Sequence, residues 1–359
     1  MKAAVCYEFG QQLVIEEVAI DPPKVGEVKV KLAACAICHS DIHYAEGAWG
    51  GTLPAIYGHE AAGVVTEVGP GVKLIQPGAH VVVTLMRSCG RCYYCAIGDP
   101  HLCETELAID REQRIRNEKG QPVLQGLRAG AFAEYVVVDE SQLVSLPADM
   151  PLDSAALLGC AVITGLGAVM NTARVSAGSS VVVIGIGGVG LNCVQGARLV
   201  GAQPVIAVDL AEKKLEAANM FGATHTINAA TNDVREVVRE LTAQCGAGYV
   251  FVAVGNVTAM EQGLKLLRKG GTLVIVGMPA SGIKMQFEPV ILADRGQRIL
   301  GSKMGSARLR VDVPKLAELY REGRLKLDEL ISARYPLKEI NAAIAAVNRG
   351  EALRNVIVF

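Results

Sequence analysis

Short apolar runs interrupted by glycine and proline fill the first 80 residues of the chain. Valine-rich stretches such as 27–32 and 63–68 end at such breaks, which is typical of short strands joined by turns. A charged stretch at 110–119 predicts an exposed loop, and strand signals return at 132–138. We therefore expect the first part of the chain to be rich in β-structure.

From about residue 160 the pattern changes, because strand-like apolar runs alternate with amphipathic segments of helix length. The expected strands lie at 181–185, 205–209, 225–227, 249–254 and 272–277, with helices near 188–201, 211–221, 233–244 and 257–268. This alternation predicts βαβ units and a doubly wound parallel sheet. Two further helices, near 312–322 and 337–348, precede a strand at 355–359 that is expected to complete the first domain.

Composition is compatible with two domains, one formed by 1–161 together with 300–359 and the other by 162–299. The chain has 359 residues, enough for two hydrophobic cores. Its net charge is -1 and only 4% of its residues are aromatic, so neither nucleic acid nor a membrane surface is an expected partner. No segment is similar to a membrane span or a secretory leader, and we expect a cytoplasmic protein.

Four cysteines in one short lobe, at 86–104, carry the strongest chemical signal. They follow the spacing C-x2-C-x2-C-x7-C, as Cys89, Cys92, Cys95 and Cys103. Four thiolates with no open position make a closed, structural zinc site. Two disulfides or scattered core cysteines are the alternative interpretation, but such clusters in cytosolic chains usually bind metal.

A glycine-rich turn follows the predicted strand and opens the next helix. It has the sequence Gly185-Ile186-Gly187-Gly188-Val189-Gly190. In a dinucleotide-binding turn the first glycine allows the tight turn, Gly187 lets the backbone approach a pyrophosphate, and Gly190 permits close packing of helix and strand. The free N–H groups of the helix N-terminus then face the phosphates.

An acidic residue ends the next strand, where it selects between nicotinamide cofactors. A carboxylate at Asp209 accepts hydrogen bonds from the ribose hydroxyls and repels a 2′-phosphate. No arginine follows at Leu210 or Ala211, and Lys214 is close enough in sequence to reach the ribose. NAD is therefore expected rather than NADP. The alternative is a glycine-rich turn in an α/β protein that binds no cofactor.

A second set of zinc-type ligands is spread over the first half of the chain. Cys38, His59 and Cys160 supply two thiolates and one imidazole. Three ligands leave one position on zinc for water or substrate, as in catalytic sites. Spacing alone does not select these three, because other cysteines are present and a buried cysteine is usually inert.

The chain resembles the zinc-dependent alcohol dehydrogenases of the medium-chain dehydrogenase/reductase superfamily, and this resemblance selects the ligands. It rests on Gly58-His59-Glu60-x2-Gly63-x5-Gly69-x2-Val72, Cys38-His39-Ser40-Asp41, the four-cysteine lobe, Gly159-Cys160, the glycine turn and Arg354-x4-Phe359. It covers nearly the whole chain and is more specific for the family than for the substrate. It implies a GroES-like, β-rich catalytic domain and a Rossmann cofactor domain. Cys38, His59 and Cys160 would hold a catalytic zinc, and the lobe a structural one.

The resemblance also implies roles for the residues around that zinc. Asp41 would orient the ligating histidine, and Glu60 would lie beside the zinc and coordinate it transiently. Ser40 matches the hydroxyl that takes the proton of the alcohol, and His43 matches the histidine that passes this proton to solvent. Cofactor contacts are expected at His39, Thr164, Val189, Val254, Val276, Met278 and Arg354. Hydride transfer between the alcohol and NAD is expected to be reversible.

Positions that line the substrate pocket in this family are apolar here, namely Trp49, Leu85, Met278 and Ile299. An apolar slot favours an alcohol with a hydrocarbon body, so we expect a primary alcohol, with aromatic and allylic alcohols as variants. An anionic alcohol becomes the alternative if an arginine reaches the slot, although a charged run is usually a solvated surface. The candidates are Arg87, Arg111, Arg114, Arg116 and Arg128.

Two features bear on assembly. The segment between Cys103 and Phe132 is intermediate in length between those of the family's dimers and tetramers, and 271–290 matches the family's subunit-pairing edge. A homodimer or a homotetramer is therefore expected.

Other interpretations stay open within the same chemistry. The substrate could be a thiol–aldehyde adduct such as hydroxymethyl-glutathione, or a polyol, and NAD could be held tightly and recycled by an external aldehyde. An alternative from another class is a zinc-free quinone reductase or a non-catalytic relative of the same fold. Those chains lack the Cys38, His59 and Cys160 set.

Overall fold

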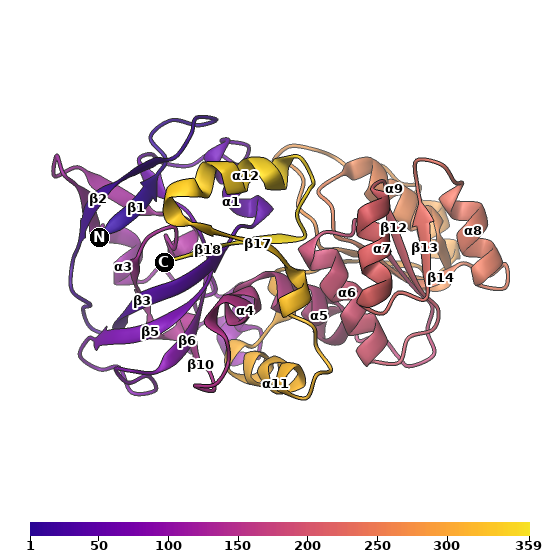
Figure 1. Cartoon of the computed structure of the whole chain (residues 1–359). Coiled ribbons are helices and arrows are strands. Elements are labelled where there is room, and N and C mark those ends of the chain that lie inside the picture. Colours follow the sequence, from indigo (N-terminus) through magenta and orange to yellow (C-terminus); the bar gives the residue numbers. More distant parts are fainter. The chain divides into compact units, whose positions relative to one another are not determined.

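The computed structural model describes all residues, 1–359, and separates them into two compact units. The first unit consists of Met1–Ala161 and Arg308–Phe359, and the second of Val162–Ala307. Figure 1 shows the chain from its indigo N-terminus to its yellow C-terminus, which returns to the first unit. The catalytic candidates and the glycine turn therefore lie in different units.

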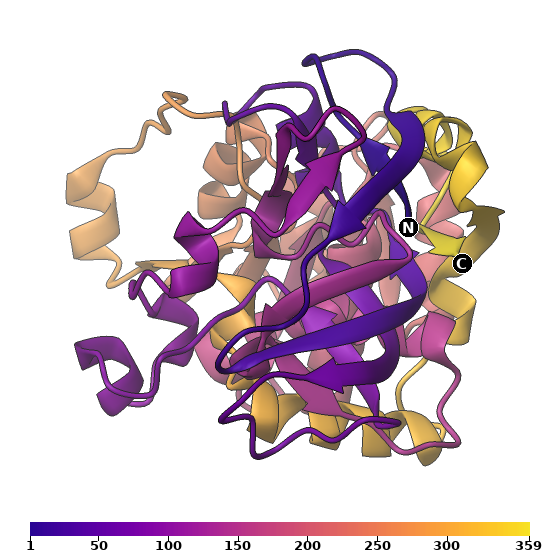
Figure 2. The same ribbon diagram turned by 90° about the vertical axis from the view of Figure 1, so that its left-hand side faces the viewer.

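Two sheets build the first unit (Figure 2). The five-stranded sheet has the order β1 (Lys2–Val5), β2 (Val14–Ile20), β7 (Ile115–Asn117), β8 (Pro122–Gln125) and β4 (Ala55–Ile56). The larger sheet has the order β10 (Leu143–Ser145), β6 (His80–Thr84), β5 (Glu60–Val68), β3 (Glu27–Ala36), β18 (Arg354–Val358) and β17 (Ile331–Pro336), and β9 (Tyr135–Asp139) also pairs with β3. These elements confirm the predicted β-rich first part.

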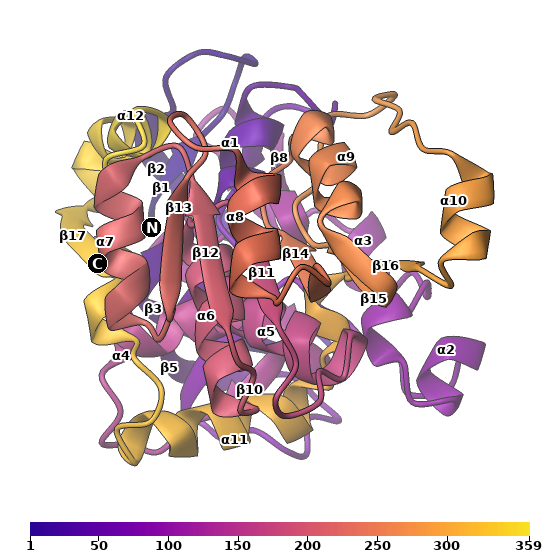
Figure 3. The ribbon, with the colours of Figure 1, turned by 90° about the vertical axis from the view of Figure 1, so that its right-hand side faces the viewer.

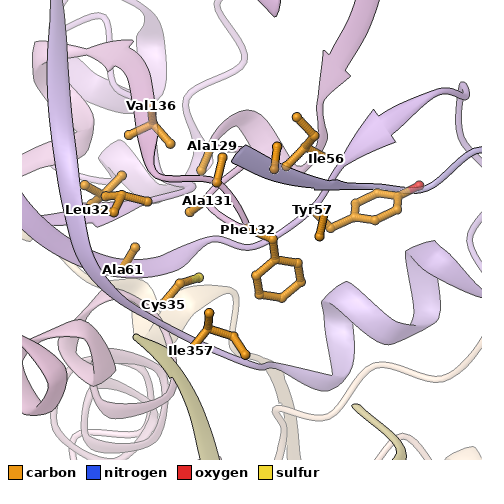
Figure 4. Packing of buried hydrophobic residues seen from close by; sticks show 14 of the residues in the cluster. Leu32, Cys35, Ile56, Tyr57, Ala61, Ala129, Ala131, Phe132, Val136 and Ile357 are labelled. Atoms are coloured by element: carbon orange, nitrogen blue, oxygen red, sulfur yellow. The ribbon is translucent and has the colours of Figure 1, made fainter. Parts of the chain in front are cut away.

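The core of this unit lies between the sheets and contains the valines that predicted the strands. Figure 4 shows Phe132 among buried side chains of β3, including Leu32 and Cys35, with Ile357 of the last strand nearby. In β18, Ile357 pairs with Cys35 in antiparallel register. The last strand therefore lies inside the sheet, between β3 and β17, as expected for a strand that completes the first domain.

The prediction of an exposed loop at 110–119 is wrong for 114–117, which are mostly buried and include β7. Ile115 begins β7 and is fully buried, and Arg114 is only 2% exposed. The Arg114 guanidinium donates to both carboxylate oxygens of Glu27, at 3.1 and 2.6 Å. A charge that is paired in this way can be buried, so the charged sequence does not mark a solvated surface.

Short helices complete the first unit. Near the strand ends lie α1 (His39–Ala45), α2 (Tyr93–Ala96), η1 (Pro100–Leu102), α3 (Ala108–Arg111), η2 (Gly126–Arg128), η3 (Glu140–Gln142), α4 (Leu152–Ala156) and η4 (Leu157–Gly159). The C-terminal part adds α11 (Leu309–Arg321), η7 (Asp328–Leu330), η8 (Leu337–Glu339) and α12 (Ile340–Asn348).

The second unit is a six-stranded sheet in which all strand pairs are parallel (Figure 3). Its order is β13 (His225–Asn228), β12 (Val205–Asp209), β11 (Val181–Ile184), β14 (Ala247–Val252), β15 (Leu267–Ile275) and β16 (Arg298–Gly301). The connecting helices are α6 (Gly188–Leu199), α7 (Glu212–Met220), α8 (Val234–Leu241) and α9 (Val257–Lys265), and α5 (Ala161–Gly167), η5 (Ala168–Thr172), α10 (Pro289–Asp294) and η6 (Met304–Ser306) flank the sheet in sequence. The order reverses beside β11, which confirms the doubly wound Rossmann architecture.

Two boundaries differ from expectation near the end of this unit. β16 pairs in parallel with β15, so the predicted domain boundary at residue 300 falls within a strand, and the second unit continues to Ala307. The segment 271–290 is a strand only as far as Ile275, and β16 rather than β15 forms the edge of the sheet. The exposed apolar residues from Met278 to Phe287 therefore belong to a surface loop that leads into α10.

No single helix is long and apolar enough to cross a membrane. One bent pair, Leu152–Gly159 with Ala161–Thr172, meets the criterion by length and composition only.

Candidate metal and cofactor sites

Three predicted zinc ligands converge in the first unit from separate elements. Cys38 lies between β3 and α1, His59 directly precedes β5, and Cys160 follows η4. Their ligand atoms lie within 4.8 Å of one another, and all three residues are buried. The His59 Nε2 atom is 3.2 Å from the Cys160 Sγ atom. Two sulfurs and one imidazole nitrogen fit a zinc ion that keeps one position for substrate.

Asp41 fixes the geometry of this ligand set. Its Oδ1 atom lies 2.8 Å from His59 Nδ1 and accepts a hydrogen bond from the Gly58 N–H, at 2.9 Å. Its Oδ2 atom accepts from the Cys38 N–H, at 3.1 Å. A carboxylate beside Nδ1 keeps the proton on that nitrogen and leaves the Nε2 lone pair for a metal. The predicted role of Asp41 therefore has a physical basis in contacts to both ligands.

The electrostatics of the set favour a bound cation. The hydrogen bond with Cys160 outweighs burial and, with Arg354 close by, holds the pKa of Cys38 well below its usual value. The pKa of Cys160 is raised, because it shares that hydrogen bond and is buried. Burial lowers the pKa of His59, but the Asp41 carboxylate more than offsets this effect and the net shift is upward. Zinc therefore binds here in exchange for protons.

Glu60 and Arg354 form a second buried pair beside the ligands. The Glu60 Oε1 atom accepts from the Ala161 N–H at 3.1 Å, whereas Oε2 has no hydrogen bond and lies 3.7 Å from Arg354 Nη2. Burial raises the pKa of Glu60 to about 7. Arg354 is 4% exposed and donates to the Ile37 carbonyl at 3.1 Å. An uncommitted carboxylate oxygen at this place is compatible with transient metal coordination, and a pyrophosphate contact of Arg354 stays a prediction.

The predicted proton-transfer residues Ser40 and His43 lie on α1, together with the predicted cofactor contact His39. Residues three apart on a helix are neighbours on its surface. The rings of His43 and Trp49 are 5.1 Å apart. Trp49 also contacts Tyr44 edge-on, with ring centroids 5.2 Å apart. Trp49 therefore forms an aromatic wall beside the predicted proton path.

The four-cysteine lobe places its sulfurs together as predicted. The Sγ atoms of Cys89, Cys92, Cys95 and Cys103 lie within 4.8 Å of one another, and all four thiols are free. The disulfide interpretation is therefore wrong. The Sγ atoms of Cys92 and Cys103 are 3.8 Å apart, whereas a disulfide bond has a length of about 2.05 Å. The Thr105 hydroxyl donates to Cys89 Sγ at 3.0 Å, and this contact lowers the pKa of Cys89 to about 6. A thiolate at neutral pH is the form that binds zinc.

In the second unit, three glycines of the turn differ in backbone conformation or in the space around them. Gly185 has φ of +90°, a conformation that other residues rarely adopt. A Cβ atom on Gly190 would lie 1.9 Å from the Gly185 carbonyl oxygen, so α6 packs too closely for a side chain. A Cβ atom on Gly187 would have no neighbour within 4 Å. The loop is therefore open at Gly187, where a pyrophosphate is expected.

Asp209 is tied to this turn. Its Oδ2 atom accepts from the Ile186 N–H at 2.7 Å, and its Oδ1 atom accepts from the N–H groups of Leu210 and Ala211, at 2.8 and 3.0 Å. Lys214 is half-buried on α7. A carboxylate held at the end of β12 fits the expected ribose contact.

The other cofactor candidates of this unit are placed as follows. Thr164 is buried on α5, and its hydroxyl lies 3.8 Å from the Met304 sulfur. Val276 is buried after β15, whereas Val254 and Met278 are exposed. A Cβ atom on Gly277 would clash with the Val254 backbone at 2.4 Å, so the loops after β14 and β15 meet at the carboxyl edge of the sheet. This close approach was not predicted; the isolated glycine at the strand end was its only signal.

The remaining pocket candidates have differing environments. Leu85 is half-buried after β6, and Met278 is exposed. Ile299 packs against the hydrophobic core of the second unit. That environment differs from the expected substrate slot, because alternate residues of the edge strand β16 point to the core.

Most of the arginines proposed for an anionic substrate already have acidic partners. Arg114 binds Glu27 and Glu112, and Arg87 pairs with Asp110. Arg111 lies 2.8 Å from a Glu106 oxygen, and Arg128 lies 4.0 Å from Asp110. Arg116 alone is exposed without an ion pair. These arginines are largely neutralised within the first unit.

Comparisons with known proteins agree with this geometry. Residues 24–148 match the alcohol dehydrogenase GroES-like domain model, and residues 188–322 match the zinc-binding dehydrogenase model. The chain is 39% identical to alcohol dehydrogenase class-3 of Cereibacter sphaeroides, covering 100% of this chain and 99% of that protein. It is 37% identical to S-(hydroxymethyl)glutathione dehydrogenase of Paracoccus denitrificans, with the same coverage.

A solved structure extends the agreement to the whole fold. Benzyl alcohol dehydrogenase from Acinetobacter calcoaceticus superposes with a TM-score of 0.93 at 32% identity, covering 100% of this chain and 99% of that chain. Both family models, the full-length relatives and the two sulfur-containing ligand sets therefore lead to one conclusion: the chain belongs to the zinc-dependent alcohol dehydrogenases of the medium-chain dehydrogenase/reductase superfamily.

Proposed function

We propose that the protein oxidises the hydroxymethyl adduct of a thiol, of the S-(hydroxymethyl)glutathione type, with NAD as the electron acceptor. The observation that carries this proposal is the identity of 37–39% over the full length to relatives named as class-3 alcohol dehydrogenases and S-(hydroxymethyl)glutathione dehydrogenases. These relatives favour the thiol-adduct alternative over a simple primary alcohol. The family uses zinc and NAD, and the donor sets for both fit.

Each residue at the catalytic centre has a separate proposed role. When bound, zinc supplies a Lewis acid that makes the substrate hydroxyl more acidic, and NAD supplies the hydride acceptor. Cys38, His59 and Cys160 would hold the ion, and Asp41 keeps the His59 Nε2 lone pair directed at it. Ser40 would take the hydroxyl proton and pass it along α1 to His43.

A benzylic alcohol is the second candidate, favoured by a different observation. The centroid of the Trp49 ring lies 5.1 Å from that of His43 and 5.2 Å from that of Tyr44. A flat aromatic wall beside the proton path suits a planar substrate, because aromatic rings prefer edge-on or offset contacts. The similarity to benzyl alcohol dehydrogenase supports this candidate.

The deciding experiment measures NADH formation by the purified, zinc-loaded protein. We expect kcat/KM for S-(hydroxymethyl)glutathione to exceed that for benzyl alcohol, and both to exceed that for short aliphatic alcohols. The reverse order would favour the aromatic candidate. Absence of turnover with every alcohol would contradict both.

A matched pair of cysteine variants tests the catalytic zinc. We expect Cys38→Ala to lose turnover and one of about two zinc ions per chain. Cys35→Ala removes a thiol three residues earlier, from a buried side chain that belongs to the hydrophobic core, and is expected to retain both ions. Equal activity and zinc content in the two variants would refute the assignment.

We also propose that the protein is a homo-oligomer. The surface segment after β15 exposes Met278, Ile283, Phe287, Val290 and Ile291. Exposed apolar side chains grouped in one segment are typical of an association surface. Light scattering of the purified protein, with Val290→Lys as the disrupting variant, tests this proposal; a monomeric wild type would refute it.

A further inference from the structure

A cavity in the first unit borders the four-cysteine lobe but includes none of the predicted metal ligands. It has a volume of about 130 Å³ and is lined by the start of the lobe, by η1 and η3, and by the start of α11. Its wall includes Arg87, Ser88, Ser141, Arg308 and Arg310, and no acidic residue lines it. A cavity of this size with only positive charges on its wall is suited to an anion.

Two of the three arginines carry charge that is not used elsewhere. Arg308 and Arg310 are exposed and take part in no ion pair. Arg87 differs, because it donates to the Gln142 side chain at 2.5 Å, to Asp110 and to the Arg128 carbonyl at 3.0 Å. It is therefore a rigid part of the wall. On α11 the Asp312 carboxylate accepts a hydrogen bond from the Arg308 N–H at 2.7 Å. This carboxylate therefore already has a donor, whereas the two guanidinium groups have no ion pair.

A buried hydroxyl adds a donor to the wall. Ser141 is 9% exposed, and its oxygen accepts a hydrogen bond from the Ser88 N–H at 3.1 Å. Its own proton has no acceptor within the protein, so it is available to a ligand in the cavity. The 13-residue helix α11 begins at the same place, with Arg308 as an N-cap that provides no side-chain acceptor. The positive end of the helix dipole therefore adds to the two arginines.

Strand pairing sets an upper limit on the distance between the cavity and the catalytic centre. Glu60, next to the ligand His59, pairs with Thr84 across β5 and β6, and Met86 at the cavity wall follows two residues later. With about 3.8 Å between consecutive Cα atoms and about 5 Å across an antiparallel pair, Met86 lies at most about 16 Å from His59. An extended tripeptide spans about 10 Å, to which its side chains add length.

We propose that this cavity binds a carboxylate of the anionic thiol-adduct substrate, through Arg308, Arg310 and the Ser141 hydroxyl. The inference rests on the proposed function, because it names the part of the protein that would hold the peptide end of that substrate. It also explains how a chain in which most of the arginines in or after the lobe are paired with acids could select an anionic alcohol.

The test combines binding and kinetics on the zinc- and NAD-loaded protein. The probe for binding is S-methylglutathione, an analogue that cannot be oxidised, titrated by calorimetry. The test variants are Arg308→Gln with Arg310→Gln, and Ser141→Ala. The control is Arg235→Gln, which removes an exposed, unpaired arginine of α8 in the second unit.

We expect the double variant to bind the probe at least tenfold more weakly, and Ser141→Ala several-fold more weakly, with the control unchanged. The KM for S-(hydroxymethyl)glutathione should rise by a similar factor, whereas the KM for uncharged benzyl alcohol should change less than twofold. Wild-type affinity in the double variant, or an equal change for both substrates, would overturn the inference.

Two further outcomes separate the inference from the proposed function. If the wild type binds the probe, the double variant does not bind it, and the wild type does not oxidise the adduct, the cavity is supported and the proposed function is refuted. Inorganic phosphate is the second probe: if it binds through Arg308 and Arg310 but S-methylglutathione does not displace it, the cavity holds a free anion and the inference fails.

Discussion

Adding a single methyl group to the glycine turn should impair stability at one position and NAD binding at another, three residues away. At Gly190 a Cβ atom would lie 1.9 Å from the Gly185 carbonyl oxygen, whereas real Cβ atoms essentially never come closer than 3.0 Å. The start of α6 would have to withdraw by more than 1 Å, although its side chains Leu191 and Val194 are fully buried. Overpacking of this kind typically costs about 1–3 kcal/mol, and we expect about 3 kcal/mol for Gly190→Ala because the helix moves as a unit.

At Gly187 the same methyl group meets no atom within 4 Å, and the backbone angles of φ −91° and ψ −169° suit alanine. Gly187→Ala should therefore leave the free energy of unfolding within about 0.5 kcal/mol of the wild type, since replacing glycine also restricts the unfolded chain. The methyl group would instead occupy the space through which a pyrophosphate approaches the turn. A tenfold or greater loss of NAD affinity, about 1.4 kcal/mol, is expected.

Urea unfolding of the cofactor-free variants and calorimetric titration with NAD separate the two effects. The expected pattern is a shifted unfolding midpoint for Gly190→Ala only, and weakened NAD binding at normal stability for Gly187→Ala. Wild-type NAD affinity in Gly187→Ala would show that the phosphates do not pass this residue. Unchanged stability of Gly190→Ala would refute the packing argument.

Three further predictions concern the first unit. Asp41→Asn should weaken zinc binding by about 10–100-fold, measured by competition with a chelator; unchanged affinity would refute the orienting role. Arg114→Leu leaves the buried Glu27 carboxylate with a hydrogen bond from the Lys24 N–H but without a charged partner, and should cost about 3–5 kcal/mol, measured by urea unfolding; a cost below about 1 kcal/mol would contradict burial of this pair. Hydrogen bonds from Lys24 and Arg114 lower the pKa of Glu112 to about 2. A lowered carboxylate pKa stabilises the protein above about pH 4.3, and this contribution is lost as the pH falls towards 2. Glu112→Gln should therefore flatten the decline of the urea midpoint between those pH values; an unchanged profile would refute it.

The sequence was most informative where the chemistry is local. The strand at 205–209 appears in the structure with the predicted bounds. A short apolar run between a proline, here Pro204, and an acidic residue is typical of a buried strand. The four lobe cysteines and the glycine turn were likewise found from spacing alone, since their partners lie within a few residues.

Long-range pairing limited the rest of the prediction. Arg114 is buried because it meets Glu27, a residue 87 positions earlier in the chain, and no local pattern reveals that partner. The catalytic ligands Cys38 and Cys160 required the family resemblance, because their neighbour Cys35 is also buried and is not a ligand. Similarly, only the parallel pairing of β16 shows that the second unit continues beyond residue 299.

The central position of β18 has a consequence for how the protein is made. The ribosome makes this strand after β3 and β17, yet those two strands cannot be joined without it. The second unit is contiguous in sequence and can fold while synthesis continues, whereas Met1–Ala161 must wait for Arg308–Phe359. A nascent chain therefore exposes unfinished sheet edges until β18 is made, and a chain truncated before Arg354 would have a finished nucleotide-binding half and an open metal-binding half. Quality control by chaperones and proteases would thus act on a chain in which β18 has not yet paired.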